Sequence, residues 1–285
     1  MRKTHRSFLF VLTVLFLCGS GAAAAQPPLQ NDEIDVFMEK VLEQREISWD
    51  ELYDYVFIET MKLDFAGMEI AAIESFEHEY TWFVRDGYLV RSPYRMNGVG
   101  VSAEEKAEYE SEWLSDMQEG ERSTRIERDS FFDFEFEPGN YFFAGREIFE
   151  GREVVKIEYY PTHLFSDEGD EEEDEDDEFD RAFDKTSLIT MLIVPEEHQI
   201  VKVTFDNLGL DFLPGRWLVQ VEELKASMIM DMPIEGVWLP RLIQASGRIS
   251  TASGALSLDF SREFSDYRQT EVGAKVKYGR PKIKG

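Results

Sequence analysis

The sequence predicts an α+β fold, in which two N-terminal helices precede a long antiparallel β-sheet. Three observations support this prediction: helical periodicity over 33–62, period-two alternation from Ile73 onward, and tight-turn residues between the alternating segments. Strands that are joined by short turns favour an antiparallel meander over parallel crossovers. We count eight or more such strands, which a chain of 285 residues can hold in one domain.

The N-terminus has the three parts of a secretory signal peptide. Basic residues precede an apolar run over 8–18, and an A-x-A site ends at Ala25. The apolar run is shorter than the about 20 residues that a transmembrane helix needs. We therefore predict that residues 1–25 are removed, and that the mature protein begins at Gln26 and is periplasmic or secreted. Lipidation of Cys18 is the alternative, because a leucine stands three residues before it, as in a lipobox.

Three helices are predicted from apolar periodicity and from capping signals. Ser48 and Glu51 have capping-box spacing, which predicts that a second helix starts within 33–62 and packs on the first. A further helix is predicted between Ser102, which opens another capping box, and Gly120. The apolar stripes that define the first and the last of these helices are Ile34, Phe37, Met38, Val41 and Leu42, and Tyr109, Trp113, Leu114 and Met117.

The strands are predicted from alternating side chains and from turn residues. Residues 73–84 alternate between an aromatic face and a polar face, and Asp86-Gly87 is a favoured pair for a tight hairpin turn. The chain then returns over 88–94. The other predicted strands are 132–136, 141–148, 152–160, 188–194, 200–205, 217–230, 237–249 and 255–267.

Charge is distributed unevenly along the chain. The formal net charge is −28, and residues 167–180 carry twelve acidic side chains. We expect a single domain over 26–272, with an acidic loop at 166–181 and a flexible basic tail at 273–285. A protein this acidic lacks the basic footprint that nucleic-acid binding requires, so no nucleic-acid partner is expected.

No catalytic motif is present in the sequence. The nucleophile elbow, the phosphate-binding loop, the dinucleotide-binding turn and the metalloprotease HExxH pattern are all absent. His78, His163 and His198 have no metal-ligand spacing, and the acidic run lacks the ligand pattern of an EF-hand. The sequence therefore predicts a protein that is not an enzyme, with no cofactor, no catalytic residue and no dedicated metal site.

Aromatic side chains at alternating positions are the remaining candidates for a site. They can line the apolar cavity of a curved sheet that does not close, because ligand pockets are mostly apolar. The alternative is that they form an ordinary sheet core. The candidate ligand-binding residues are Phe76, Tyr80, Trp82, Phe132, Phe134, Phe136 and Trp217.

Three short motifs resemble a known superfamily. They are Tyr-Phe-Phe-Ala-Gly-Arg-Glu over 141–147, Gly-Arg-Glu-Val-Val-Lys-Ile over 151–157, and Val-Trp-Leu-Pro over 237–240. Together with the signal peptide, the N-terminal helices and the meander, they resemble the LolA/LolB-like lipoprotein carriers and, more closely, secreted bacterial proteins related to that fold. The resemblance covers about 65–268. It implies an incomplete antiparallel barrel, closed by helices, whose apolar interior can hold acyl chains.

These observations lead to two functional hypotheses. The first is an exported, non-enzymatic binding protein that carries a lipid or a lipoprotein acyl chain in the cell envelope. The second is an envelope interaction protein with a filled core, which docks a protein partner through its acidic loop or its basic tail. A continuous apolar cavity would favour the first hypothesis, and a packed interior would favour the second.

Overall fold

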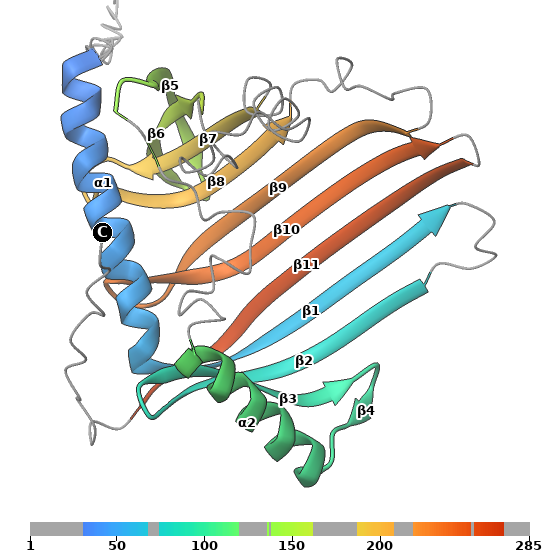
Figure 1. The fold of residues 1–285 in the computed structure, drawn as a ribbon. Helices are drawn as coiled ribbons and strands as arrows, with labels where there is room; N and C mark the ends of the chain where they lie inside the picture. Colours follow the sequence, from blue (N-terminus) through green and yellow to red (C-terminus); the bar gives the residue numbers. More distant parts are fainter. Residues whose placement is uncertain are drawn as a thin grey trace, which may run out of the picture.

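The computed structural model describes residues 31–67, 74–119, 136, 138–161, 187–207, 219–251 and 254–270. Within these ranges the chain forms one 11-stranded sheet with two α-helices and a short 3-10 helix (Figure 1). The predicted signal peptide, acidic loop and basic tail lie outside the described residues. The elements are α1 (Asn31–Glu51), η1 (Leu52–Asp54), β1 (Tyr55–Gly67), β2 (Glu74–Arg85), β3 (Tyr88–Met96), β4 (Val99–Gly100), α2 (Ala103–Glu119), β5 (Tyr141–Phe149), β6 (Arg152–Tyr159), β7 (Ser187–Val194), β8 (Gln199–Asn207), β9 (Val219–Ile234), β10 (Val237–Thr251) and β11 (Gly254–Gln269).

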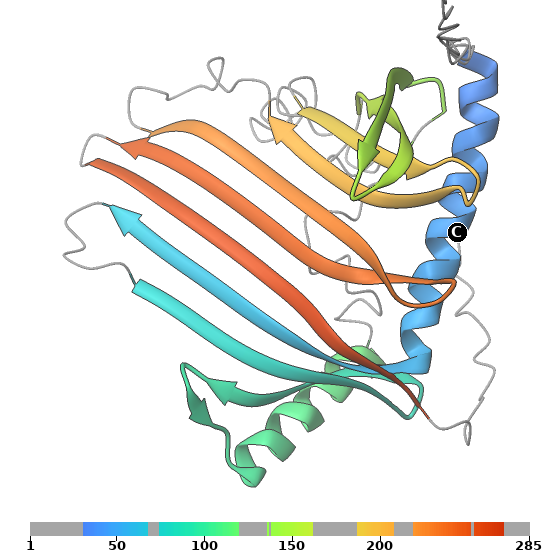
Figure 2. The ribbon, with the colours of Figure 1, turned by 180° about the vertical axis from the view of Figure 1, so that it is seen from behind.

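The sheet joins two antiparallel meanders. Its strand order is β4-β3-β2-β1-β11-β10-β9-β8-β7-β6-β5, so the first meander meets the second where β1 pairs with β11. The sheet is curved and does not close, because β4 and β5 lie at its two edges (Figures 1 and 2). The predicted α+β fold with an incomplete antiparallel barrel is therefore confirmed.

The hairpins predicted from turn residues are present. Asp86 and Gly87 have positive φ angles of 51° and 85° and connect β2 to β3. Glu150 and Gly151 have the same backbone signs, at 48° and 83°, and connect β5 to β6. Two consecutive residues with positive φ match the right-handed twist of the flanking strands, which is why these pairs form tight turns.

The second N-terminal helix predicted within 33–62 is wrong. The first helix continues through Ser48 to Glu51, and the chain then forms strand β1. Ser48 does not cap a helix; its hydroxyl donates to Oε1 of Gln199 at 2.9 Å. The segment from Tyr55 onward is rich in β-branched and aromatic residues, and its period of two places alternate side chains in the core, which outweighs the capping signal.

Both helices pack through the apolar stripes that the sequence predicts. In α1, Ile34, Met38 and Val41 are buried, and the helix crosses one end of the sheet, where it contacts β5, β8 and β10 (Figure 1). Helix α2 lies along β3, with Trp113 and Met117 buried. Its predicted capping box is confirmed by the Ser102 and Glu105 hydrogen bonds. Among the described residues, neither helix is long and apolar enough to span a membrane.

The two faces of the sheet differ in chemistry. We call the face against which α1 and α2 pack the inner face, and the opposite one the polar face. Strand register places Met61, Arg262, Ile243, Met228 and Val203 in one row across the inner face. The next positions of the same strands belong to the polar face: Lys62, Ser261, Gln244, Ser227 and Thr204. Of the two faces, the inner one is therefore the apolar one.

Candidate ligand-binding face

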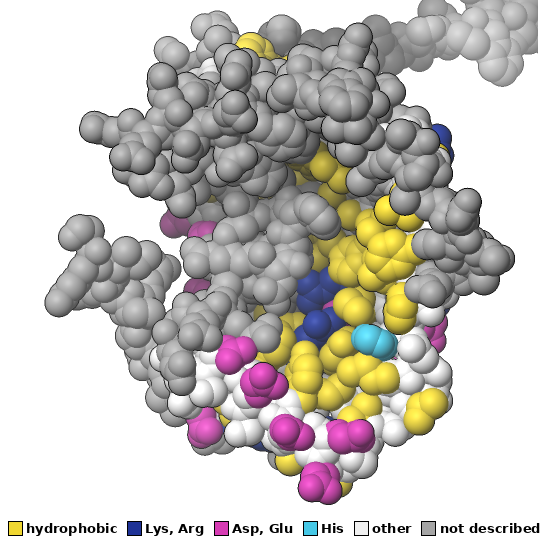
Figure 3. Space-filling view, turned by 45° about the vertical axis from the view of Figure 1, so that its right-hand side comes forward, with side chains coloured by type: hydrophobic (Ala, Val, Ile, Leu, Met, Phe, Trp, Pro, Cys, Tyr) yellow, Lys and Arg dark blue, Asp and Glu magenta, His cyan; other side chains and the backbone are white. Residues whose placement is uncertain are grey.

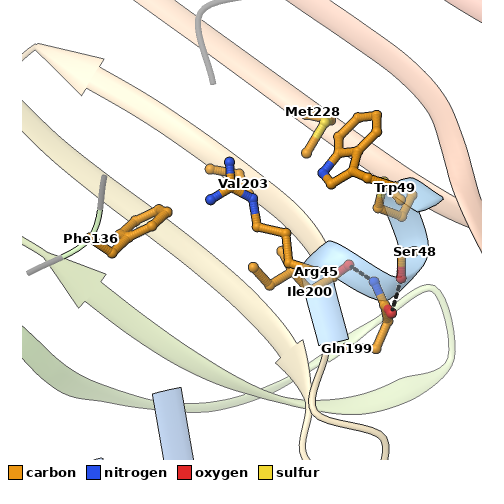
Figure 4. Close-up of a pocket in the computed structure, with 9 residues that line it drawn as sticks. Arg45, Ser48, Trp49, Phe136, Gln199, Ile200, Val203 and Met228 are labelled. Carbon is orange, nitrogen blue, oxygen red and sulfur yellow. Dashed lines mark hydrogen bonds between the residues drawn. The ribbon is translucent and has the colours of Figure 1, made fainter. Parts of the chain in front are cut away.

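One part of the inner face, next to the helices, is packed. We call it the packed zone; its buried residues include Phe57, Trp82, Phe264 and Met228. The cavity between α1 and strands β8 and β9 has a volume of about 20 Å³, close to that of one water molecule (Figure 4). Ligand pockets have volumes of about 300–1,000 Å³, so this cavity is too small for an acyl chain.

The small cavity is closed by polar and aromatic contacts. Buried Gln199 accepts a hydrogen bond from Ser48 of α1 and donates one from Nε2 to the carbonyl oxygen of Ile200 at 2.7 Å (Figure 4). The guanidinium of Arg45 lies over the ring of Phe136, 5.4 Å from its centroid. These contacts attach the C-terminal half of α1 to β8, and they fix one end of the inner face.

Farther along the same strands, the inner face is apolar but only partly covered. We call this part the open zone. It consists of six apolar side chains on β1, β2 and β11 that are half-buried or exposed: Leu63, Phe65, Phe76, Leu256, Leu258 and Phe260. Of these, Phe76 is 36% exposed. The rings of Phe65 and Phe76 meet edge-on, with centroids 6.4 Å apart. Contiguous apolar surface of this kind marks a binding site more often than scattered apolar side chains do.

A cluster of charged side chains separates the two zones. Glu59 of β1 is fully buried and accepts hydrogen bonds from Arg262 Nε at 2.7 Å, from Arg91 Nη2 at 2.7 Å and from Arg91 Nε at 3.0 Å. Trp82 Nε1 also donates to Glu59, at 2.6 Å. We call Glu59, Arg91 and Arg262 the charged cluster. Figure 3 shows basic side chains at the centre of a largely hydrophobic surface.

The electrostatics of the cluster favour the charged forms of Glu59 and Arg91. Burial raises the pKa of Glu59, but the positive charges of Arg262 and Arg91 outweigh burial and lower the pKa below its ordinary value. Burial opposes the charged form of Arg91, yet Glu59 raises its pKa above the usual value. Tyr80 lies against Arg91, with its ring centroid 3.6 Å from the guanidinium carbon, and burial raises the pKa of Tyr80.

The seven residues predicted to bind ligand fall into three groups. Phe76 lies in the open zone, whereas Tyr80 and Trp82 are 4% and 2% exposed, at the charged cluster and in the packed zone. Phe136 lines the small cavity beside α1. The remaining three, Phe132, Phe134 and Trp217, lie outside the described residues. The structure therefore does not bring Phe76 and Phe136 to one site.

Sequence reasoning missed the charged cluster. Its three members lie on β1, β3 and β11, and a single charged residue in each strand gives no motif. The available signal was alternation: Tyr55, Phe57, Met61 and Leu63 are apolar at every second position, and Glu59 interrupts them. A charged side chain at an inward position is rarely buried unless it is paired, so Glu59 predicts cationic partners from other strands.

Across the described ranges, no group of three or more His, Cys, Asp or Glu side chains is placed to hold a metal ion. The inner face offers an apolar surface beside a guanidinium group. That combination can hold an apolar chain and can contact one anionic group.

No protein-family model matches the sequence, and no curated protein matches it either. Solved structures with a similar fold include a domain assigned as an outer-membrane lipoprotein-sorting protein from Vibrio parahaemolyticus, with 12% identity and a TM-score of 0.33 over 83% of this chain and 93% of that chain.

Two further solved structures are similar. One is a DUF1329 family protein from Desulfovibrio piger, with 11% identity and a TM-score of 0.36 over 85% of this chain and 95% of that chain. The other is a LolA superfamily protein from Nitrosomonas europaea, with 11% identity and a TM-score of 0.25 over 85% of this chain and 97% of that chain. The LolA-like resemblance predicted from the sequence is thus found again among solved structures.

Proposed function

We propose that the protein is an exported, non-enzymatic binding protein that carries a lipid or a lipoprotein acyl chain in the cell envelope, with the apolar chain lying on the open zone. The observation that carries this proposal is the change in burial of apolar side chains along the inner face of the sheet. Its apolar side chains are packed near the helices and are partly uncovered on the far side of the charged cluster. Burying a fully exposed phenylalanine or leucine contributes about 1.5–3 kcal/mol, and covering each of these partly exposed side chains contributes part of that amount.

The position of the open zone supports binding of an elongated ligand. Its side chains lie in adjacent rows: Leu63 is opposite Phe76 and Phe260, and Phe65 is opposite Leu258. Three neighbouring strands therefore present one continuous apolar surface. The polar face of the same strands carries charged and hydroxyl side chains, so the surface is one-sided.

The proposal is tested with a neutral fluorescent probe, N-phenyl-1-naphthylamine. Wild-type protein is expected to bind it saturably. The double variant Phe65→Gln/Phe76→Gln should bind at least about tenfold more weakly, because two apolar contacts are lost and each factor of ten corresponds to about 1.4 kcal/mol. The matched control is Asp64→Gln/Ser75→Gln, one position earlier on the polar face of both strands, where the two residues are paired. It should bind like the wild type.

The alternative function is an interaction protein with a filled core. The small volume of the cavity beside α1 favours it. If the wild type binds no apolar probe, or if both double variants bind it equally, the carrier proposal is wrong and the alternative is preferred.

A further inference from the structure

Arg91 enters the inner face from the packed zone and points toward the open zone. Arg91 is paired with Trp82 on the neighbouring strand, and Trp82 is paired with Phe57, so these three residues form one row across the strands. Its guanidinium reaches the carboxylate of Glu59, one row farther, and its Nη2 lies 3.5 Å from the sulfur of Met61, two rows farther. The next row in that direction begins the open zone. The guanidinium therefore lies at the boundary between the two zones.

The guanidinium of Arg91 is only partly engaged. Its Nε and Nη2 bind Glu59, whereas Nη1 has no hydrogen-bond partner among the residues that the structure describes. The Arg91 side chain is 14% exposed, whereas the side chain of Glu59 is fully buried. The ring of Tyr80, 3.6 Å away, supports the plane of the guanidinium. A guanidinium has five N–H donors in a rigid plane, so donors remain for a ligand.

Among the described residues, the charged cluster has an excess of positive charge. Two guanidinium groups face one carboxylate, and burying each ion costs several kcal/mol after relaxation. The single charge of Glu59 balances only one of the two guanidinium charges that it contacts. The positive charge is also local, because the whole chain carries a net charge of −28 and repels anions at longer range.

We propose that Arg91 binds the anionic head group, a carboxylate or a phosphate, of an amphiphile whose acyl chain lies on the open zone. This inference rests on the proposed function and names the ligand class of the same site. Arginine suits the role because its planar donors match carboxylate and phosphate oxygens. The apolar surroundings strengthen such a contact, since they exclude the water that would compete for it.

The test is displacement of the neutral probe by three ligands with the same 12-carbon chain: dodecanoate, dodecyl phosphate and dodecanol. The measurement is made at physiological ionic strength, where the Debye length is about 8 Å. Wild-type protein should bind at least one of the two anions about 10- to 100-fold more tightly than dodecanol. This difference in affinity is the one expected for a charge-assisted hydrogen bond. The preferred anion distinguishes a fatty acid from a phosphate head group. Arg91→Gln should abolish the preference and leave the affinity for dodecanol within about twofold.

The matched control is Arg95→Gln, on the same strand, where the side chain is 46% exposed and binds Glu79 instead of Glu59. It should keep the anion preference. Arg91→Lys retains the charge without the planar donors and should show an intermediate preference, which keeps the test decisive if Arg91→Gln fails to fold.

The outcomes separate the two proposals. If wild-type protein binds dodecanol as tightly as both anions, the head-group inference is overturned and the carrier proposal stands. If it binds neither the probe nor any of the three ligands, both are overturned. If Arg95→Gln loses the preference as fully as Arg91→Gln does, the effect belongs to the surface charge and the assignment to Arg91 is wrong.

Discussion

The substitution Trp82→Ala measures how tightly the packed zone is held together. Trp82 is 2% exposed, stacks on Phe57 at 5.9 Å and meets Trp113 edge-on at 5.6 Å. Removing a large buried aromatic side chain costs about 3–5 kcal/mol, and losing the hydrogen bond to charged Glu59 costs about 1.5–3 kcal/mol. Since the two losses overlap, we expect the free energy of unfolding to fall by about 4 kcal/mol or more, out of the about 5–15 kcal/mol typical of a protein domain.

Equilibrium unfolding in urea measures this loss. The slope of the unfolding free energy against urea concentration should be the same for wild type and variant, which shows that the unfolded state has not changed. Trp82→Phe keeps one aromatic ring but removes the Nε1 donor and part of the packed indole, so it should lose at least about 1.5–3 kcal/mol, the contribution of the hydrogen bond, and less than Trp82→Ala. Phe76→Ala, on the same strand and face but in the open zone, should lose less than about 2 kcal/mol, because fewer neighbours surround it. A loss below about 2 kcal/mol for Trp82→Ala would show that Trp82 lines a cavity, and would refute the division into two zones.

Three further predictions concern charge and processing. Glu59→Gln should lower the free energy of unfolding by about 3–5 kcal/mol, because it leaves buried guanidinium groups without their carboxylate; urea unfolding measures this. The pKa of Glu59 is lowered in the folded protein, so its ionised carboxylate stabilises the fold above the ordinary carboxyl pKa of about 4.3. This stabilisation is lost as the pH falls through the folded pKa. The wild type should therefore lose more stability in acid than Glu59→Gln does. Deleting 167–180 should change the melting temperature by less than about 10 °C, and a larger fall would assign a structural role to this run. Intact mass should place the mature N-terminus at Gln26, whereas a lipid-modified Cys18 at the terminus would contradict the predicted cleavage.

Much of the sheet could be predicted because its signals are local. Alternation and turn pairs fixed strands β2, β3, β5 and β6, and the hairpins at Asp86-Gly87 and Glu150-Gly151 followed from backbone preferences of adjacent residues. The strand β1 was missed because Ser48 and Glu51 also satisfy a capping box, and that pattern occurs here inside a helix. What decided the outcome was burial of alternate residues between β2, the next strand in the chain, and β11, which is far away in sequence.

The candidate site was harder to predict for the same reason. Phe76 could be chosen from the alternation of its own strand, but alternation does not show whether an inward position is packed or open. Trp82 has the same pattern and lies in the packed zone. The charged cluster depends on the pairing of β1 with β11, which brings Glu59 and Arg262 together across 203 positions of the chain. No local signal specifies that pairing.

Native mass spectrometry tests whether the open zone holds an apolar chain. The chain, including the predicted signal peptide over 1–25, would be expressed, purified from the cell envelope without detergent and measured beside the two double variants. We expect a lipid-sized additional mass on the wild type and on Asp64→Gln/Ser75→Gln. It should be lost in Phe65→Gln/Phe76→Gln, because the apolar contacts on the inner face are gone. An unmodified mass for the wild type, or the same additional mass on all three proteins, would contradict this expectation.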